Sequence, residues 1–71
     1  MTLGEGLKRF RQMRGITQQQ MADAAKTYKQ NYFQYEHDLV SPNYSVLANI
    51  ADAFNVSLDY LVGRSDNPAR I

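Results

Sequence analysis

Four polar residues close together in the chain have side chains that can recognise base pairs: Lys29, Gln30, Asn31 and Gln34. Glutamine and asparagine form paired hydrogen bonds with adenine, and lysine favours the O6/N7 edge of guanine. The four residues begin the second of two short predicted helices, over residues 17–25 and 29–36, which a tight turn joins. In such a pair the second helix can enter a DNA major groove while the first braces it across the backbone. The alternative is that these side chains only solvate an ordinary helix surface.

The size and composition of the chain indicate one small folded domain. Its 71 residues are 44% hydrophobic and 21% charged, which favours a folded protein over a disordered one. The chain has no cysteine, so disulfides and thiolate metal sites are excluded. No apolar run approaches the ~18 residues of a membrane span, and the first residues lack the regions of a signal peptide. We therefore expect a cytoplasmic protein.

Basic and acidic residues are unevenly distributed along the chain, although the net charge is only +1. Residues 1–35 contain six basic and two acidic side chains, whereas residues 36–71 contain two basic and five acidic ones. This asymmetry is typical of a protein with one end facing phosphates and the other end turned away. The alternative is a basic, solvated face on the first helix.

Apolar residues recur at spacings of three or four in every segment, which predicts an all-α fold. The first helix is expected over residues 3–14, and Gly15 ends it as a left-handed cap. Its apolar face consists of Leu3, Leu7, Phe10 and Met13. Thr17 is expected to cap the second helix, with Gln20 completing a capping box. The inward face of that helix consists of Met21, Ala22 and Ala25.

The third helix is expected to begin after Thr27, which would cap it in a second capping box with Gln30. Its predicted apolar face consists of Tyr28, Tyr32 and Tyr35, with Phe33 beside it. The residues from His37 to Pro42 show no period and contain a proline that stops a helix, so they are predicted to form a loop.

Two further helices are expected in the second half of the chain. Asn43 would cap the fourth and Asn55 would end it, while Ser57 would cap a short fifth helix over residues 58–62 that ends at Gly63. The apolar face of the fourth helix consists of Val46, Leu47, Ile50, Ala51 and Phe54. The residues from Arg64 onward have no periodic pattern. We expect one domain over residues 1–64 and a flexible C-terminal tail over residues 65–71.

The chain lacks the residue sets that catalysis or metal binding require. Its single histidine, His37, lies between Glu36 and Asp38, which makes neither a metal cluster nor a catalytic triad. Gly4 and Gly6 do not follow a strand, so they predict no phosphate-binding loop. We predict no enzymatic activity, no metal and no cofactor.

Several short motifs occur in a specific order along almost the whole chain. They are LKRFR at 7–11, GITQ at 15–18, Met21-Ala22, Tyr35-Glu36, Ser41-Pro42, Leu47, IADAF at 50–54 and VSLDYLVG at 56–63. This set resembles the phage-repressor or Cro type of helix-turn-helix DNA-binding family, over about residues 3–64. The resemblance implies a compact five-helix, lambda-repressor-like domain whose helices 2 and 3 form the helix-turn-helix.

The resemblance also implies roles for the polar residues of the helix-turn-helix. Lys29, Gln30 and Gln34 would contact bases, and Asn31 would be a further base or phosphate contact. Gln18 would bond a phosphate at the start of the second helix, where N–H groups and the helix dipole favour an anion. The alternative for Gln18 is an ordinary solvent-exposed side chain.

Four other residues receive supporting roles from the resemblance. Lys26 and His37 flank the third helix and would touch the DNA backbone. Arg11 and Glu36 would form a partly buried structural ion pair that holds the third helix against the first.

The chain departs from the family pattern at two places. Lys26 stands where the family usually has glycine, in the turn where the backbone has a positive φ, and a lysine there costs on the order of 1 kcal/mol. The third helix is also rich in aromatic residues. Tyr32 stands in place of a buried isoleucine or valine, and the next residue, usually small or polar, is Phe33.

Two hypotheses of different classes follow. The first is a sequence-specific regulator of transcription that binds double-stranded DNA, resembling a phage or prophage repressor, as a homodimer on a pseudo-palindromic operator. The family places the dimer surface around Asn55, Val56, Leu58, Tyr60 and Leu61, although Val56 and either Leu58 or Leu61 could belong to the core. The second is a protein-interaction module, antitoxin-like or bound by an anti-repressor. Its supporting features are the aromatic face of the third helix, with Tyr28, Tyr32 and Phe33, and the neighbouring Lys26; Tyr28 and Phe33 could face either DNA or another protein.

Overall fold

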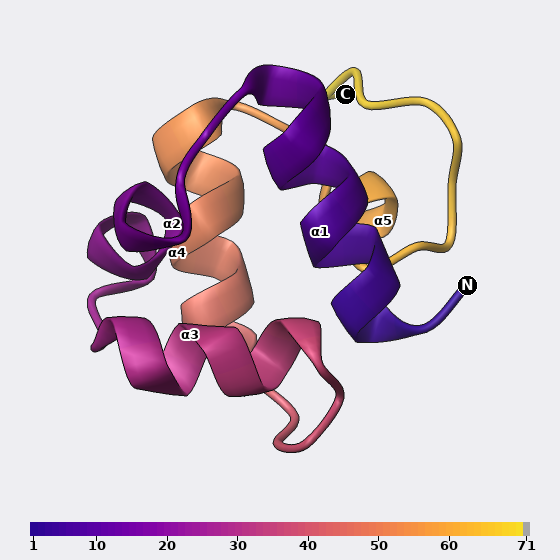
Figure 1. The fold of residues 1–71 in the computed structure, drawn as a ribbon. Helices are drawn as coiled ribbons and strands as arrows, with labels where there is room; N and C mark the ends of the chain where they lie inside the picture. The colour runs from indigo at the N-terminus through magenta and orange to yellow at the C-terminus, as the bar shows by residue number, and fades with distance from the viewer. Residues whose placement is uncertain (71) are drawn as a thin grey trace.

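The computed structural model describes residues 1–70, which form helices and loops without any strand (Figure 1). The helices are α1 (Leu3–Arg14), α2 (Gln18–Ala25), α3 (Lys29–Glu36), α4 (Tyr44–Phe54) and α5 (Leu58–Leu61). The predicted all-α fold with a helix-turn-helix in helices α2 and α3 is confirmed. The fifth helix ends at Leu61, one residue earlier than expected.

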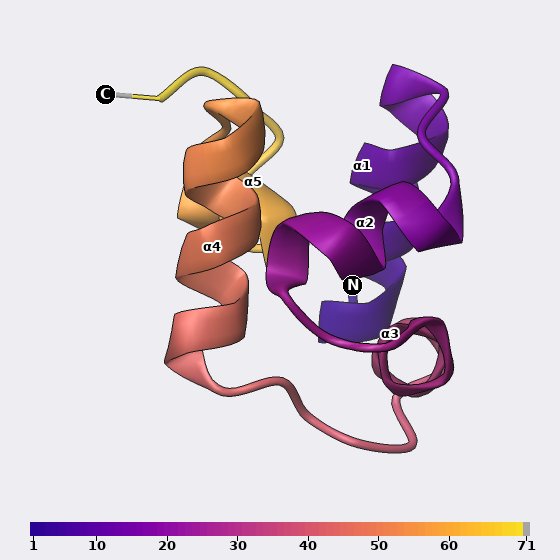
Figure 2. The same ribbon diagram turned by 90° about the vertical axis from the view of Figure 1, so that its left-hand side faces the viewer.

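Helix α3 lies across one end of the molecule (Figure 1) and is seen end-on in Figure 2. Helix α1 contacts α3 and α5, while α2 contacts α3 and α4, and α4 contacts α5. The loop after α3 leads along this end of the molecule to the start of α4 (Figure 2). Helix α3 is thus supported by α1 and α2 and keeps its other side free.

Side-chain caps explain where most of the helices begin. Thr17 and Gln20 form the predicted capping box of α2, and the side chains of Asn43 and Ser57 cap α4 and α5 as expected. Gly15 ends α1 with a left-handed backbone at φ 64°. These contacts join residues three or four positions apart, so the sequence alone predicts them.

The predicted start of α3 is wrong in its details. Tyr28 occupies the cap position without a side-chain hydrogen bond, and its side chain is 78% exposed instead of lying on an apolar face. The Thr27 hydroxyl accepts a hydrogen bond from Asn31 Nδ2 at 3.0 Å, so it does not cap the helix. Lys26 has the predicted positive φ, at 60°. Because Tyr28 is the cap residue, Thr27 lies one residue too early to cap α3, and the predicted capping box with Gln30 is not formed.

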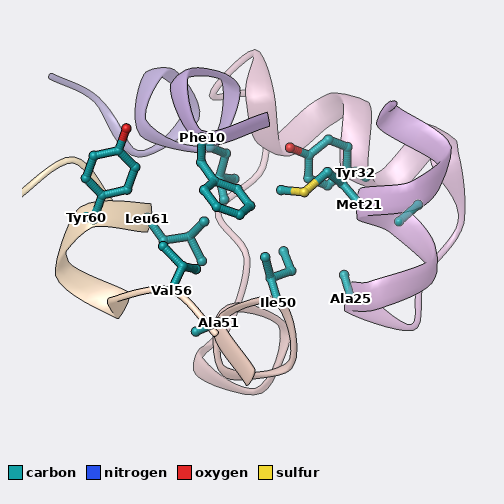
Figure 3. Packing of buried hydrophobic residues seen from close by; sticks show 11 residues of the cluster. Phe10, Met21, Ala25, Tyr32, Ile50, Ala51, Val56, Tyr60 and Leu61 are labelled. Carbon is teal, nitrogen blue, oxygen red and sulfur yellow. The ribbon is translucent and has the colours of Figure 1, made fainter. Parts of the chain in front are cut away.

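The core is one cluster shared by all the helices (Figure 3). Leu7 and Phe10 of α1 meet Met21 of α2, Tyr32 of α3 and Ile50 of α4, and all are fully buried. Met13, expected on the inward face of α1, is instead 49% exposed. The Met13 sulfur accepts a hydrogen bond from the Tyr60 hydroxyl at 3.2 Å.

Most of the predicted dimer surface belongs to this core. Val56 and Leu61 are fully buried and Tyr60 is 5% exposed, because α5 packs against α1 and α4 (Figure 3). These three residues are therefore not available to a second copy of the chain. Asn55 is exposed and Leu58 is partly buried, so these two remain as surface residues of the predicted set.

The C-terminal segment makes hydrogen bonds with the domain. Arg9 donates to the Ser65 carbonyl at 2.8 Å, and Ser57 N–H donates to the Pro68 carbonyl at 3.0 Å. The Arg70 guanidinium donates to the Ala51 carbonyl in α4. The flexibility of this tail stays a prediction, whereas its long-range hydrogen bonds were not expected, because no local sequence pattern marks them. Ile71, also part of the predicted tail, lies outside the described residues.

Candidate nucleic-acid interface

An open groove runs between the start of α2 and the free face of α3. It is lined by Gln18, Gln19, Lys29, Gln30, Phe33, Gln34 and Leu39. Helical spacing explains why the four lining residues from α3 lie together, because residues three or four positions apart lie on one face of a helix. The structure therefore brings together three of the predicted base-contacting residues with the predicted phosphate contact on α2.

The remaining predicted DNA contacts lie outside the lining of this groove. The Asn31 amide is bonded to Thr27. Lys26 is exposed in the turn before α3. The His37 ring, just after α3, lies against the Phe33 ring with the two centroids 4.1 Å apart. Lys26 precedes α3 and His37 follows it, so both residues flank this helix as predicted.

The predicted ion pair between α1 and α3 is present. Arg11 Nε donates to Glu36 Oε2 at 2.6 Å, and Arg11 Nη2 donates to Glu36 Oε1 at 3.2 Å. The two side chains are 18% and 2% exposed, so the pair is largely removed from water. Gln18 Nε2 also donates to Glu36 Oε1, at 3.4 Å. The carboxylate therefore connects α1, α2 and α3 directly behind the groove.

The electrostatics of this cluster keep Glu36 ionised. Burial acts to raise the pKa of Glu36, but hydrogen bonding from its neighbours, first of all from Arg11, and the charge of Arg11 together outweigh burial and lower the pKa below its usual value. Hydrogen bonding to Glu36 raises the pKa of Arg11 in turn. The charged pair is thus the stable form of these groups in the folded domain.

A contact between the loop after α3 and the start of α1 was not predicted. Asp38 has a left-handed backbone at φ 57°, and its carboxylate accepts hydrogen bonds from Gly4 N–H at 2.9 Å and from the Thr2 hydroxyl at 2.7 Å. Thr2 also forms a capping box with Glu5. The Thr2-Leu3-Gly4-Glu5 pattern is a sequence signal for that box. No local signal marks Asp38, since its partners are more than thirty residues away.

Acidification is expected to unfold the domain through these carboxylates. Hydrogen bonds from Thr2 and Gly4 lower the pKa of Asp38, and the pKa of Glu36 is lowered as well. Groups with a lowered pKa in the folded state stabilise it above their unfolded pKa values, about 4, and lose that effect as the pH falls through the folded values. The urea midpoint should therefore be flat from about pH 7 to pH 5 and fall steeply below about pH 4.

The variant Asp38→Asn serves as the matched comparison in this titration. It should be less stable than the parent chain at pH 7 and should show a shallower acid decline, because one titrating group is gone. Identical curves for the two proteins between pH 5 and pH 3 would show that Asp38 does not contribute.

A model of the family described as helix-turn-helix matches residues 7–61, which is more than half of the chain. The chain belongs to the helix-turn-helix family. The match includes α2, α3 and the turn between them, together with most of α1 and all of α4 and α5. The predicted resemblance is thereby confirmed.

Relatives of this helix-turn-helix chain are regulators of transcription by name. It is 36% identical over 66 residues to the HTH-type transcriptional regulator ImmR of Bacillus subtilis, covering 93% of this chain and 52% of ImmR. It is also 36% identical over 59 residues to YonR, an uncharacterized SPbeta prophage-derived HTH-type transcriptional regulator of the same organism, covering 83% of this chain and 55% of YonR. The chain thus spans about half the length of these relatives.

The fold of this helix-turn-helix chain is also found in a solved structure. A transcriptional regulator from Listeria innocua superposes with a TM-score of 0.77 at 24% identity, covering 93% of this chain and 62% of the regulator. At that identity the likeness supports the fold alone. Together with the named relatives, the family match favours the regulator hypothesis over the interaction module.

Within residues 1–70, no three metal-ligating side chains lie close enough to hold an ion. None of the helices in that range is long and apolar enough to cross a membrane.

Proposed function

We propose that this chain is a sequence-specific DNA-binding domain that regulates transcription as a repressor of the phage or prophage type. The observation that supports this most directly is the grouping of Lys29, Gln30 and Gln34 with Gln18 along one open groove. Helix α3 would lie in the major groove with Gln30 and Gln34 on base edges, and Asn31 would add a further base or phosphate contact.

The start of α2 suits the phosphate backbone beside that groove. Thr17 caps the helix through Gln20 N–H, while the N–H groups of its first two residues have no helical acceptor. Such groups and the helix dipole favour an anion. Gln18 would then bond a phosphate beside the major groove, with Lys26 and His37 on the flanking backbone and Lys29 on a base edge.

The size of the domain favours binding as two copies. Its described residues extend 29 × 23 × 22 Å, which is less than the ~34 Å of one helical turn of DNA. One copy therefore covers about half of a site, and two copies would bind a pseudo-palindrome with half-sites one turn apart. Asn55 and the exposed part of Leu58 are the surface residues that we propose for the contact between copies.

Replacing both reading glutamines tests the proposal. Duplexes selected from a random library should bind the parent chain at about 150 mM salt roughly 10³ times more tightly than scrambled DNA. Gln30→Ala/Gln34→Ala should lose most of that preference, because each paired contact discriminates between bases by about 1–3 kcal/mol. Fluorescence anisotropy measures both affinities, and circular dichroism checks the fold.

A matched control lies on α1, where Gln12 is exposed and absent from the groove. Gln12→Ala should bind selected and scrambled duplexes as the parent does. A folded double variant that keeps the full preference would rule out direct reading by α3. Equal, salt-sensitive binding of both duplexes by the parent chain would reduce the function to nonspecific attraction.

A further inference from the structure

Phe33 places an aromatic ring within an otherwise polar reading face. It lies three and four residues after Gln30 and Lys29 and next to Gln34, and its side chain is 44% exposed. The preceding residue, Tyr32, is fully buried in the core, whereas Phe33 lines the groove. The core side of the helix is therefore occupied, and Phe33 faces the groove.

Neighbouring side chains hold this ring in place. The His37 ring, one turn later, lies 4.1 Å from the Phe33 centroid at an interplanar angle of 36°. Leu39, which is 70% exposed, lines the same groove from the loop after α3. Phe33 and Leu39 are thus the two apolar side chains in the lining of the groove. The Phe33 ring packs against His37 on one side and is exposed to the groove on the other.

The surroundings of these two side chains fit DNA better than a protein partner. The side chains that line the groove, all among the described residues, are four amides, one lysine and the two apolar groups, without a carboxylate. Amides and a lysine suit the hydrogen-bonding edges and negative charge of DNA. On a base-pair edge in the major groove, the apolar group available to an exposed ring is the C5 methyl of thymine.

We propose that Phe33 reads the methyl group of a thymine next to the base contacted by Gln30 or Gln34, with Leu39 at the edge of the same contact. The inference rests on the proposed function and deepens it, since it assigns one base of the DNA site to Phe33, an aromatic residue where the family usually has a small or polar one. Phe33 would then determine specificity by apolar contact, while the glutamines do so by hydrogen bonds.

Deoxyuridine tests the proposal because it differs from thymidine only by the missing methyl group. Each thymine of the selected duplex is replaced singly, and affinities are measured by anisotropy for the parent chain and for Phe33→Ala. At one position per half-site the parent should lose about fourfold in affinity, the value of one buried methyl group. Phe33→Ala should bind the thymine and deoxyuridine duplexes equally at that position.

Two variants keep the result interpretable. Phe33→Leu retains an apolar side chain and should keep part of the methyl effect. It replaces Phe33→Ala in the test if the alanine variant is poorly folded. Tyr44→Ala removes an aromatic side chain that is 72% exposed but does not line the groove, and it should keep the full effect.

The outcomes separate this inference from the proposed function. An equal methyl effect in the parent and in Phe33→Ala, or no sensitive thymine at all, overturns the role of Phe33 while DNA reading by α3 stands. Failure of the parent to select any duplex overturns the proposed function itself, and the inference with it.

Discussion

Glu36→Leu should remove a large part of the free energy of unfolding of the domain. The substitution removes the carboxylate that is bonded to Arg11 at two points and to Gln18, and it leaves a largely buried guanidinium without its partner. Breaking a buried pair in this way costs about 3–5 kcal/mol. A domain of this size has only about 4–11 kcal/mol of stability in total. Urea denaturation followed by circular dichroism measures the loss.

The double variant Arg11→Met/Glu36→Leu tests whether the stability loss of Glu36→Leu comes from the unpaired, buried charge of Arg11 or from lost packing. Replacing both members of a buried pair with apolar groups is often neutral or stabilising, so the double variant should recover most of the stability that Glu36→Leu loses. A double variant as unstable as Glu36→Leu alone would show that the loss comes from packing.

A second ion pair supplies the control for this effect. Arg9 and Asp66 are 3.0 Å apart, but the Asp66 side chain is fully exposed. Asp66→Ala should therefore change the stability by less than about 1 kcal/mol. A loss of similar size for Glu36→Leu would mean that the buried pair is no stronger than a surface pair.

Gly4→Ala should destabilise the domain and weaken DNA binding together. A Cβ atom at this position would lie 2.7 Å from the Tyr35 carbonyl oxygen and closer still to that of Glu36. Both atoms are backbone, so α1 and α3 would have to separate. Alanine gains about 1 kcal/mol in helix propensity, but forcing atoms into a packed contact costs about 1–3 kcal/mol or more. The separation would also disturb the Gly4–Asp38 hydrogen bond and the orientation of α3.

Gly6→Ala is the matched variant for this prediction. Its Cβ would lie 2.7 Å from Gly63 N and from the Leu61 carbonyl oxygen, so it would push α1 away from α5 and not from α3. We expect a similar loss of stability in urea, with normal DNA affinity for the folded protein. Gly4→Ala with parental stability and affinity would show that the two helices have room for a methyl group.

The sequence by itself predicted the features that depend on near neighbours. The capping box of Thr17 and Gln20, the Asn43 cap and the left-handed Gly15 each involve residues within a few positions of one another. The ordered motifs likewise led to the helix-turn-helix family and to Lys29, Gln30 and Gln34 as one candidate reading face. Helical periodicity placed these side chains together without knowledge of the rest of the fold.

Only the tertiary structure decided how the helices use their apolar and charged residues. Periodicity puts Leu7 and Met13 on the same apolar face of α1, but packing buries Leu7 and exposes Met13. Asp38 bonds to Gly4, and Arg70 bonds to Ala51, across distances in the chain that no local pattern records. The physical reason is that burial and long-range hydrogen bonds depend on which elements meet in space, whereas caps and periodicity depend on the residues of one element.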